Sequence, residues 1–384
     1  MDLHIPTVEL LKKLIAIDSV TGHEESIARY IYDLLRSTRD TKVTLQKVAE
    51  SRYNVIAQKG TGSKNILLYG HLDTVPVCDG WTKEPHKPKV VHDRCYGLGA
   101  YDMKGGVAAL LEAFSVARPE HITLTLALTV DEENMGKGCE VFLKSYDFKN
   151  TLCTLCCEPG FKHGLNGITT GRSGWGIMEL EITQPSKHFI QYDRTCDMAL
   201  VFARATQVID GFATATTDGG KQFMSLRSVD MDCKGMSIAE KLLATYECSI
   251  LPPDDGWSLA TKIEKTLNDV LDKEFSLDIA LEVTFKTGAN TYYAPFKQNI
   301  KHPVYEALST SVQSITKHAA IPYFRPSVSD ENIIAAHGIY TLGIGPEGDH
   351  AHGADEWVSV KSVEALSHIL QNTIRVVDQT KIQE

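Results

Sequence analysis

Continuous apolar runs alternate with helical stretches in the first part of this chain. The runs at residues 65–69 and 122–130 are β-rich, and the second shows no polar face. A helical stretch at about 103–117 lies between them. A strand that is apolar on both sides needs cover on both sides, as in a sheet packed between helices. We therefore expect an α/β domain with a mixed, mainly parallel sheet.

Further elements extend this domain at both ends. Residues 7–16 place apolar side chains at helical spacing, and Thr21 to Glu24 has a capping-box pattern that predicts the start of a second helix. After residue 300 the sequence predicts a helix at 303–317, a strand at 341–345 and a terminal helix at 360–377.

The middle of the chain has a different pattern. Leu277 to Phe285 alternate strictly, as in a strand that is solvated on one side, and an amphipathic helix is expected at 258–272. This segment is expected to be an α+β domain. The 384 residues suggest two domains, and the second is inserted into the first. We therefore predict a discontinuous domain of residues 1–171 and 287–384 and an inserted domain of residues 172–286.

The charge balance excludes some partners. Asp and Glu number 49 against 39 Lys and Arg, a net charge of -10, so we expect no nucleic-acid partner. No apolar run approaches the roughly 18 residues of a spanning helix, so we expect no membrane partner. The acidic N-terminus and nine cysteines, an odd number, are typical of a cytoplasmic protein with free thiols. Cys153, Cys156 and Cys157 fit an interior strand better than a metal site.

Acidic and histidine residues follow the predicted strands, where α/β sheets collect ligand-binding groups. They are His71, Asp73, Asp102, Asp131, Glu132, Glu133, Glu158, His350 and His352. These residue types suit a divalent metal ion such as zinc. In an extended His-x-Asp segment the side chains of His71 and Asp73 share a face, so Asp73 is expected to accept a proton from one ring nitrogen and leave the other for the metal. Of the adjacent carboxylates, one is expected to bind metal and another to transfer protons.

Five segments occur in a known order and resemble one family. They are Gly-His-Leu-Asp-Thr-Val-Pro at 70–76, Asp-Met-Lys-Gly-Gly at 102–106, Asp-Glu-Glu at 131–133, Glu-Pro at 158–159 and Ala-His-Gly-Ala-Asp-Glu at 351–356. The family is the aminoacylase/carboxypeptidase family of dinuclear zinc metallopeptidases, which includes acetylornithine deacetylase and succinyl-diaminopimelate desuccinylase. Its fold is a zinc-binding α/β catalytic domain interrupted by an α+β lid domain, through which many members form homodimers.

The resemblance also implies roles for individual residues. His71 and Glu158 would bind one metal ion, and Glu133 and His352 the other. Asp102 would bridge the two ions, which would be zinc, with cobalt or manganese as alternatives. Asp73 would orient His71, and Glu132 would be the general acid/base. His350 competes with His352 because residues two apart on a strand share a face, but the Asp-Glu pair at 355–356 aligns His352 with the family histidine.

The resemblance is less complete in the inserted domain. The family's lid histidine stabilises the oxyanion, and His188 is its nearest match here, although Gln184 and Phe189 replace small family residues; a plain surface residue is the alternative. Arg172 and Arg325 are candidates to bind a substrate carboxylate, and surface charges are the alternative.

These features together predict a metal-dependent amidohydrolase. We expect it to cleave an N-acyl amino acid or related small molecule, as a deacetylase or similar deacylase does. An exopeptidase, either a dipeptidase or a carboxypeptidase, would use the same site on short peptide substrates. The remaining alternative is a binding protein that keeps the fold without catalysis.

Overall fold

The computed structural model describes residues 6–216, 219–275, 278–286 and 292–380. The chain divides into two compact units. The first comprises Met1–Thr170, Gln298–Tyr323 and Ser329–Glu384, and the second comprises Gly171–Lys297 and Phe324–Val328.

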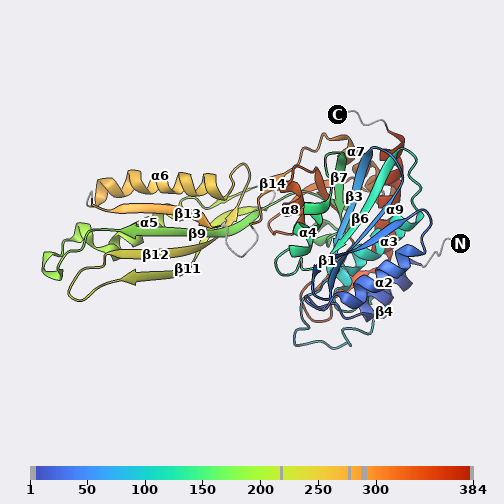
Figure 1. Cartoon of the computed structure of the whole chain (residues 1–384), viewed down its shortest axis with the longest axis horizontal. Coiled ribbons are helices and arrows are strands. Elements are labelled where there is room, and N and C mark those ends of the chain that lie inside the picture. The colour runs from blue at the N-terminus through green and yellow to red at the C-terminus, as the bar shows by residue number, and fades with distance from the viewer. Residues whose placement is uncertain (1–5, 217–218, 276–277, 287–291, 381–384) are drawn as a thin grey trace. The chain divides into compact units, whose positions relative to one another are not determined.

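A mixed sheet forms the centre of the first unit (Figure 1); its full strand order is β1-β2-β6-β3-β7-β16-β8-β14, of which β14 belongs to the second unit. The strands are β1 (Lys42–Ala49), β2 (Arg52–Lys59), β3 (Lys64–His71), β6 (Ile122–Thr129), β7 (Thr151–Cys156), β8 (Gly167–Arg172), β14 (Phe296–Lys297) and β16 (Thr341–Gly343), and β15 (Ile321–Arg325) also pairs with β8. The central strands are parallel, because β3 pairs in parallel with β6 and β7, and β7 with β16. The predicted α/β class with a mixed, mainly parallel central sheet is confirmed.

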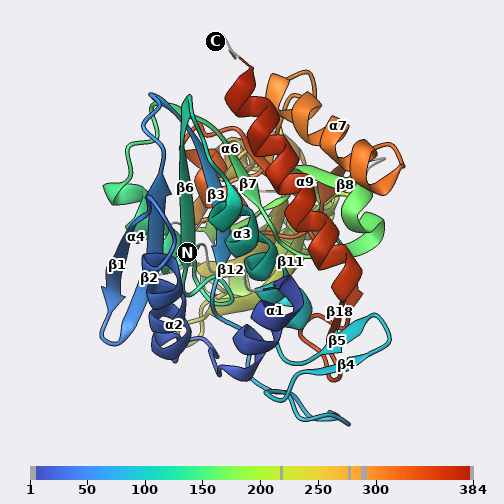
Figure 2. The same cartoon turned by 90° about the vertical axis from the view of Figure 1, so that its right-hand side faces the viewer.

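Helices cover both faces of this sheet, as Figures 1 and 2 show. One face carries α1 (Thr7–Ala16), α3 (Gly105–Val116) and α9 (Val360–Gln379), with α7 (Pro303–Thr316) beside α9; the other carries α4 (Lys137–Ser145) and α8 (Asp330–Ala336). In β3, Tyr69 faces Phe142 of α4, whereas a side chain at Gly70 would meet Met103 and Leu110. Cover on both faces explains why the central strands β3 and β6 are buried almost throughout.

The capping box that the sequence predicts at Thr21 to Glu24 is not formed, although the helix that it predicts is present. The second helix, α2 (Glu25–Arg36), packs against β1 and β2, but no side chain caps its N-terminus. Thr21 instead donates to Asp73, and Glu24 pairs with Arg52. Thr21 and Glu24 therefore have the spacing of a capping box, but their side chains bind residues far away in the sequence.

A small sheet joins two distant segments of the first unit. It contains β4 (Lys89–Val91), β5 (Arg94–Tyr96), β17 (Gly348–Asp349) and β18 (Trp357–Ser359). β5 pairs with β18, and the N–H of Gly97 donates to the carbonyl of Glu356 at 3.0 Å. This pairing brings the turn between β17 and β18 to the short turn η1 (Ala100–Lys104).

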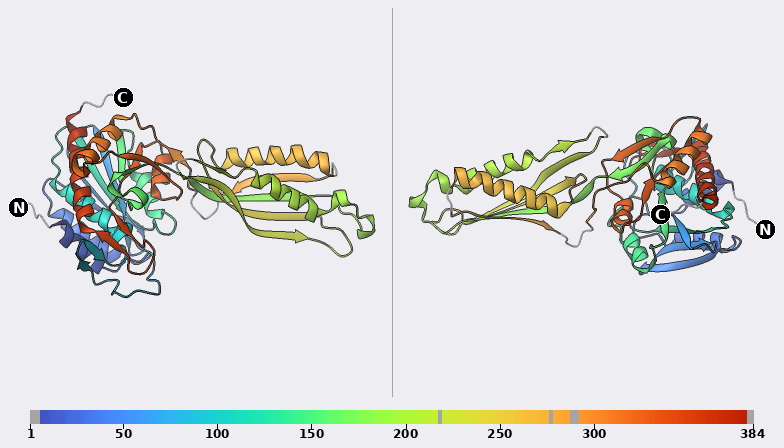
Figure 3. Two further views of the ribbon diagram at one scale, coloured as in Figure 1. Left: turned by 180° about the vertical axis from the view of Figure 1, so that it is seen from behind. Right: turned by 90° about the horizontal axis from the view of Figure 1, so that it is seen from above.

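The second unit has an antiparallel sheet with two helices on one face (Figure 3), in strand order β10-β11-β12-β9-β13. Its elements are β9 (Gly174–Thr183), α5 (Met198–Asp210), β10 (Thr214–Ala215), β11 (Lys221–Asp232), β12 (Lys241–Ile250), α6 (Gly256–Glu274) and β13 (Ala280–Lys286). Alternate residues of β9 and β12 are buried, as in a sheet with one solvated face. The α+β pattern and the helix predicted at 258–272 are confirmed, and Leu277 lies outside the described residues.

The described residues also form three short 3-10 helices, η2 (Phe161–Asn166), η3 (Phe189–Gln191) and η4 (Arg194–Cys196). Within the described residues no helix is long and apolar enough to cross a membrane. All nine cysteines lie in the described part, and none forms a disulfide.

Candidate metal centre

The candidate site lies at the carboxyl edge of the central parallel strands. His71 is the last residue of β3, Glu132 and Glu133 follow β6, and Glu158 follows β7. Because β3 runs parallel to both β6 and β7, these three strand ends meet at one edge of the sheet.

Asp102 reaches the same edge from the η1 turn, which Glu356 holds in place. The buried carboxylate of Glu356 accepts hydrogen bonds from the main-chain N–H groups of Gly99 at 2.6 Å, Tyr101 at 2.8 Å and Asp102 at 2.8 Å. The turn that presents Asp102 is therefore held by the residue that immediately precedes β18.

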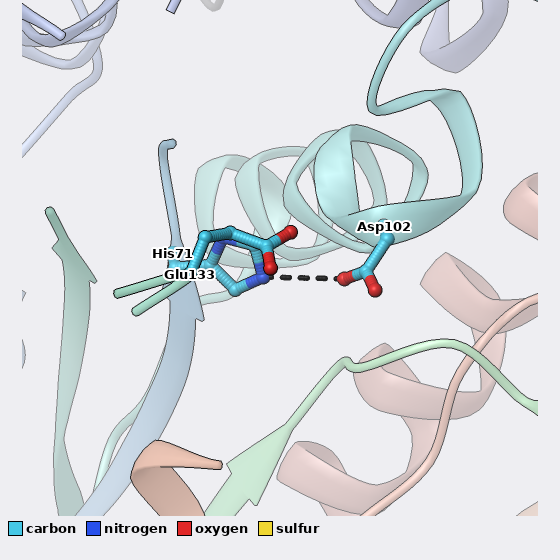
Figure 4. A group of neighbouring side chains, drawn as sticks. All are labelled: His71, Asp102 and Glu133. Carbon is cyan, nitrogen blue, oxygen red and sulfur yellow. Dashed lines mark hydrogen bonds and ion pairs between the residues drawn. The ribbon is translucent and has the colours of Figure 1, made fainter. Parts of the chain in front are cut away.

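His71 faces several of these carboxylates. Its Nε2 lies 3.3 Å from Oδ1 of Asp102 (Figure 4), 3.6 Å from Oε1 of Glu158 and 4.0 Å from Oε2 of Glu132. Glu133, drawn in front of this imidazole in Figure 4, brings a carboxylate oxygen within 4.8 Å of it.

His352 approaches Asp102 from the other oxygen. Its Nε2 lies 3.4 Å from Oδ2 of Asp102 and 3.0 Å from Oε2 of Glu133. Asp102 therefore lies between two imidazoles, with one carboxylate oxygen directed at each.

His350 has a different environment. Its Nδ1 lies 2.9 Å from the carbonyl oxygen of Ala354. The expectation that His350 and His352 share the face of a strand is wrong, because both have positive φ angles, 63° and 61°, in a turn after β17. The turn directs only His352 at the carboxylates.

Asp73 connects His71 to the loop after β6. Nδ1 of His71 donates to the main-chain carbonyl of Asp73 at 3.0 Å, while the carboxylate oxygen that was expected to accept this proton lies 3.6 Å away. The carboxylate instead accepts from the main-chain N–H groups of Glu132 at 3.2 Å and Glu133 at 3.1 Å, and from the hydroxyl of Thr21 at 2.9 Å. Asp73 therefore orients both the imidazole and the two glutamates.

The crowding of buried charges shifts the pKa values of these groups. Burial, and next the negative charge of Glu158, raise the pKa of Glu132 well above its usual range. Burial also raises the pKa of Glu133 to about 7. Burial alone would raise the pKa of Asp102, but its hydrogen bonds to His352 and His71 lower it instead. Carboxylates that are ionised only at a cost in free energy are favourable positions for cations.

The donor set fits divalent metal ions. Two groups of side chains bring their ligand atoms within 4.8 Å of one another, namely His71, Asp102 and Glu133, and His71, Glu132 and Glu158. Imidazole nitrogens and carboxylate oxygens suit zinc, cobalt and manganese.

Sequence reasoning missed two residues that support this cluster. Glu356 was used only to align a motif, and nothing local indicates that it holds the Asp102 turn. Asp330 is buried, and its Oδ2 accepts from the hydroxyls of Tyr69 at 2.6 Å and Thr129 at 3.4 Å. Its negative charge contributes to the raised pKa of Glu132.

The remaining candidates belong to the second unit, whereas the cluster belongs to the first. His188 is exposed, and its Nδ1 accepts from the N–H of Ile190 at 3.3 Å. Arg172 and Arg325 are buried, with exposed fractions of 0% and 5%, so the alternative that they are surface charges is wrong. Arg172 donates to the hydroxyl of Ser327 at 3.1 Å.

The fold and the donor set together define a metal-dependent hydrolase. Comparison with known proteins agrees: the chain belongs to peptidase family M20/M25/M40, whose model matches residues 67–376. The family resemblance noted in the sequence is thereby confirmed.

Individual relatives cover almost the whole chain. A succinyl-diaminopimelate desuccinylase of Sulfurovum sp. (strain NBC37-1) is 26% identical over 390 residues, which cover 97% of this chain and 99% of the relative. Among solved structures, aminopeptidase PepT from Bacillus cereus has a TM-score of 0.70 at 18% identity, with 97% and 98% of the two chains covered. The YXEP protein of Bacillus subtilis, a dinuclear metal binding peptidase from the M20 family, has a TM-score of 0.71 at 12% identity, with 97% and 98% covered. These two structures show that the fold is shared.

Proposed function

We propose that this protein hydrolyses the amide bond of an N-acyl amino acid or a related small molecule. The observation that carries the proposal is the position of Glu132, a partly buried carboxylate that lies 4.0 Å from the metal-ligand candidate His71 and has a raised pKa. The relative from Sulfurovum acts on a succinyl-diaminopimelate by its name, so N-succinyl amides are the first substrate class to test.

The same cluster supports a two-metal site. In our proposal His71 and Glu158 would bind one ion, Glu133 and His352 would bind the other, and Asp102 would contribute an oxygen to each. The distances from Asp102 support bridging, since its two oxygens lie 3.3 Å and 3.4 Å from the two imidazoles. We propose zinc as the metal, with cobalt and manganese as substitutes, because the donors are nitrogen and oxygen.

The chemistry follows from the positions of these groups. Two bound divalent ions would lower the pKa of water and polarise the scissile carbonyl. Glu132 takes the proton of the attacking water and returns it to the departing amine, a role that its raised pKa favours. Asp73 keeps Glu132 and His71 in position through the hydrogen bonds described above.

We propose that the second unit acts as a lid. His188 would donate a hydrogen bond to the oxyanion, and Arg172 and Arg325 would hold a substrate carboxylate. The proposal for the arginines rests on the guanidinium group, which can hold a carboxylate through two parallel hydrogen bonds.

A homodimer through this unit is also part of the proposal. Within the described residues, β11 pairs along its length with β12 but only by its first two residues with β10. Its exposed apolar residues are Phe223, Leu226, Val229 and Met231. An edge strand with apolar side chains is suited to pairing with a second copy of the chain.

The absence of disulfides among the nine cysteines supports a cytoplasmic location.

An exopeptidase is the second candidate function. Several proteins of the same fold are peptidases by name, and a peptide bond is also an amide that this donor set would serve. The substrate separates the two candidates.

The test is a chelation and reconstitution assay. Metal is removed with a chelator, and zinc, cobalt or manganese is restored before N-acetyl amino acids, N-succinyl amino acids and dipeptides are supplied. We expect metal-dependent cleavage of N-acyl amino acids. Cleavage of dipeptides alone would favour the exopeptidase, and no cleavage of any substrate with any metal would contradict both and leave the binding protein.

A further inference from the structure

A buried ion-pair cluster lies beside the loop that carries Glu132 and Glu133. Arg52, the first residue of β2, donates from Nε to Oε2 of Glu24 at 2.9 Å, and its terminal nitrogen contacts the other oxygen of Glu24. The same terminal nitrogen lies 2.8 Å from Oδ1 of Asp131. Glu24 is 0% exposed and the Asp131 side chain 4%, so both carboxylates are buried next to this guanidinium.

Asp131 organises the loop that follows it. Its main-chain carbonyl accepts from the N–H groups of Met135 at 3.0 Å and Gly136 at 2.7 Å, and its Oδ2 accepts from the N–H of Lys137 at 3.3 Å. Its φ angle is 77°, in the left-handed region that glycine adopts without steric cost. The backbone alone therefore favours glycine here, and the aspartate side chain must contribute something that glycine would not.

The loop that follows β6 is thus held from the sides of the two strands that flank β6. On the side of β3, Asp73 accepts from the N–H groups of Glu132 and Glu133. On the side of β2, Arg52 holds Asp131, the residue immediately before them. Two anchors on a three-residue segment restrict the directions in which both glutamate side chains leave the backbone.

We propose that Arg52 is a positioning residue for Glu132 and Glu133 that acts through Asp131. The inference rests on the proposed function, because it assigns significance to the positions of these two glutamates. A buried ion pair is weak support for stability by itself, since apolar residues of similar volume often serve as well. Orientation of the loop is the role that the geometry assigns to it.

The first experiment removes the side chain of Asp131 and at the same time replaces it by the residue that best adopts its positive φ angle. Asp131→Gly suits the positive φ, and Arg52 keeps Glu24 as its partner, so we expect a folded protein. We expect kcat on an N-succinyl amino acid to fall about 10- to 100-fold, and the zinc dissociation constant of the metal-free protein, measured by competition with a chelator, to rise about 10-fold or more. The matched control is Lys317→Gly, at an exposed residue with φ 66° after α7, which should change neither quantity.

The second experiment tests whether Arg52 acts through Asp131. Asp131→Gly is combined with Arg52→Met in a Glu24→Gln background. The Glu24→Gln substitution prevents a buried, unpaired carboxylate at residue 24 when the guanidinium is lost. If the two residues act in one path, Asp131→Gly will lower kcat and zinc affinity less than about 2-fold once Arg52 is absent. Losses that add in full would overturn the inference.

The outcomes also separate this inference from the proposed function. If the wild-type protein cleaves the substrate and Asp131→Gly changes neither kcat nor zinc affinity by more than about 2-fold, the inference is overturned but the proposed function stands. A wild-type protein that binds zinc but cleaves no substrate refutes the proposed function, while weaker zinc binding by Asp131→Gly would still support the positioning role.

Discussion

At the scale of single residues, the metal cluster is expected to hold protons that an incoming cation must displace. Hydrogen bonds to Asp102 and Glu133 raise the pKa of His352 to about 11, against the opposing effect of partial burial. Burial raises the pKa of Glu133 to about 7. Near neutral pH, His352 of the metal-free site is therefore protonated and Glu133 is protonated in part of the molecules. Binding of a cation to these ligands requires the loss of these protons.

We predict that zinc binding releases protons. Calorimetric titration of the metal-free protein at about pH 7, in buffers with different ionisation enthalpies, should give heats that depend on the buffer and indicate release of about one proton or more. Zinc affinity should fall as the pH is lowered through about 7, because Glu133 then gains a proton that the metal must displace. Equal heats in all buffers would contradict this prediction.

Asp330 leads to a prediction about stability. Burial raises its pKa from 3.8 to about 7 in the folded protein, so between these values the folded state holds a proton that the unfolded chain has lost. The stability that the protonated Asp330 contributes to the folded protein is fully present below pH 3.8 and is lost as the pH rises through about 7. Asp330→Asn should remove that dependence and raise the melting temperature of the metal-free protein above neutral pH by a few degrees, roughly. Thermal unfolding at several pH values tests this, and an unchanged slope would refute it.

At the scale of elements, the sequence predicts strand ends better than it predicts what holds the loops. The apolar runs locate β3, β6 and β7, and the parallel arrangement then brings His71, Glu133 and Glu158 together. The contributions of Glu356 and Arg52 depend on contacts between segments far apart in the chain, and neither has a local pattern. The same limit explains the mistaken capping box, since Thr21 and Glu24 have the right spacing but distant partners.

We predict that Glu356 is needed to present Asp102. Glu356→Ala removes the acceptor of three main-chain N–H groups, and the loosened turn should lower zinc affinity about 10- to 100-fold. The neighbouring Asp355→Ala is the control, because Asp355 accepts from Thr82 and Lys83 instead. Equal losses in the two variants would show that the effect is not specific to the turn.

At the scale of the whole molecule, the proposal divides the work between two units. The first contains every metal-ligand candidate, and the second contains His188, Arg172 and Arg325. Sequence reasoning locates the candidates of the first unit that follow strand ends, although it missed Glu356 and Asp330. It is weaker for the second, since His188 lies in a short turn whose pattern departs from the family.

We predict that His188→Ala lowers turnover while metal content stays the same. Loss of an oxyanion donor costs about 100- to 1000-fold in kcat. Turnover and metal content are measured on the same preparation, with His318→Ala, an exposed histidine of the first unit, as the control. Unchanged turnover would remove His188 from the mechanism.

The rate of Glu132→Gln at equal zinc content tests the central claim most directly. The substitution keeps the size of the side chain but removes the group that transfers protons. If Glu132 is the general acid/base beside a two-metal site, kcat on an N-acyl amino acid should fall about 100-fold or more while bound zinc per chain stays equal to wild type. A variant that holds the same zinc and cleaves at the wild-type rate would contradict the account.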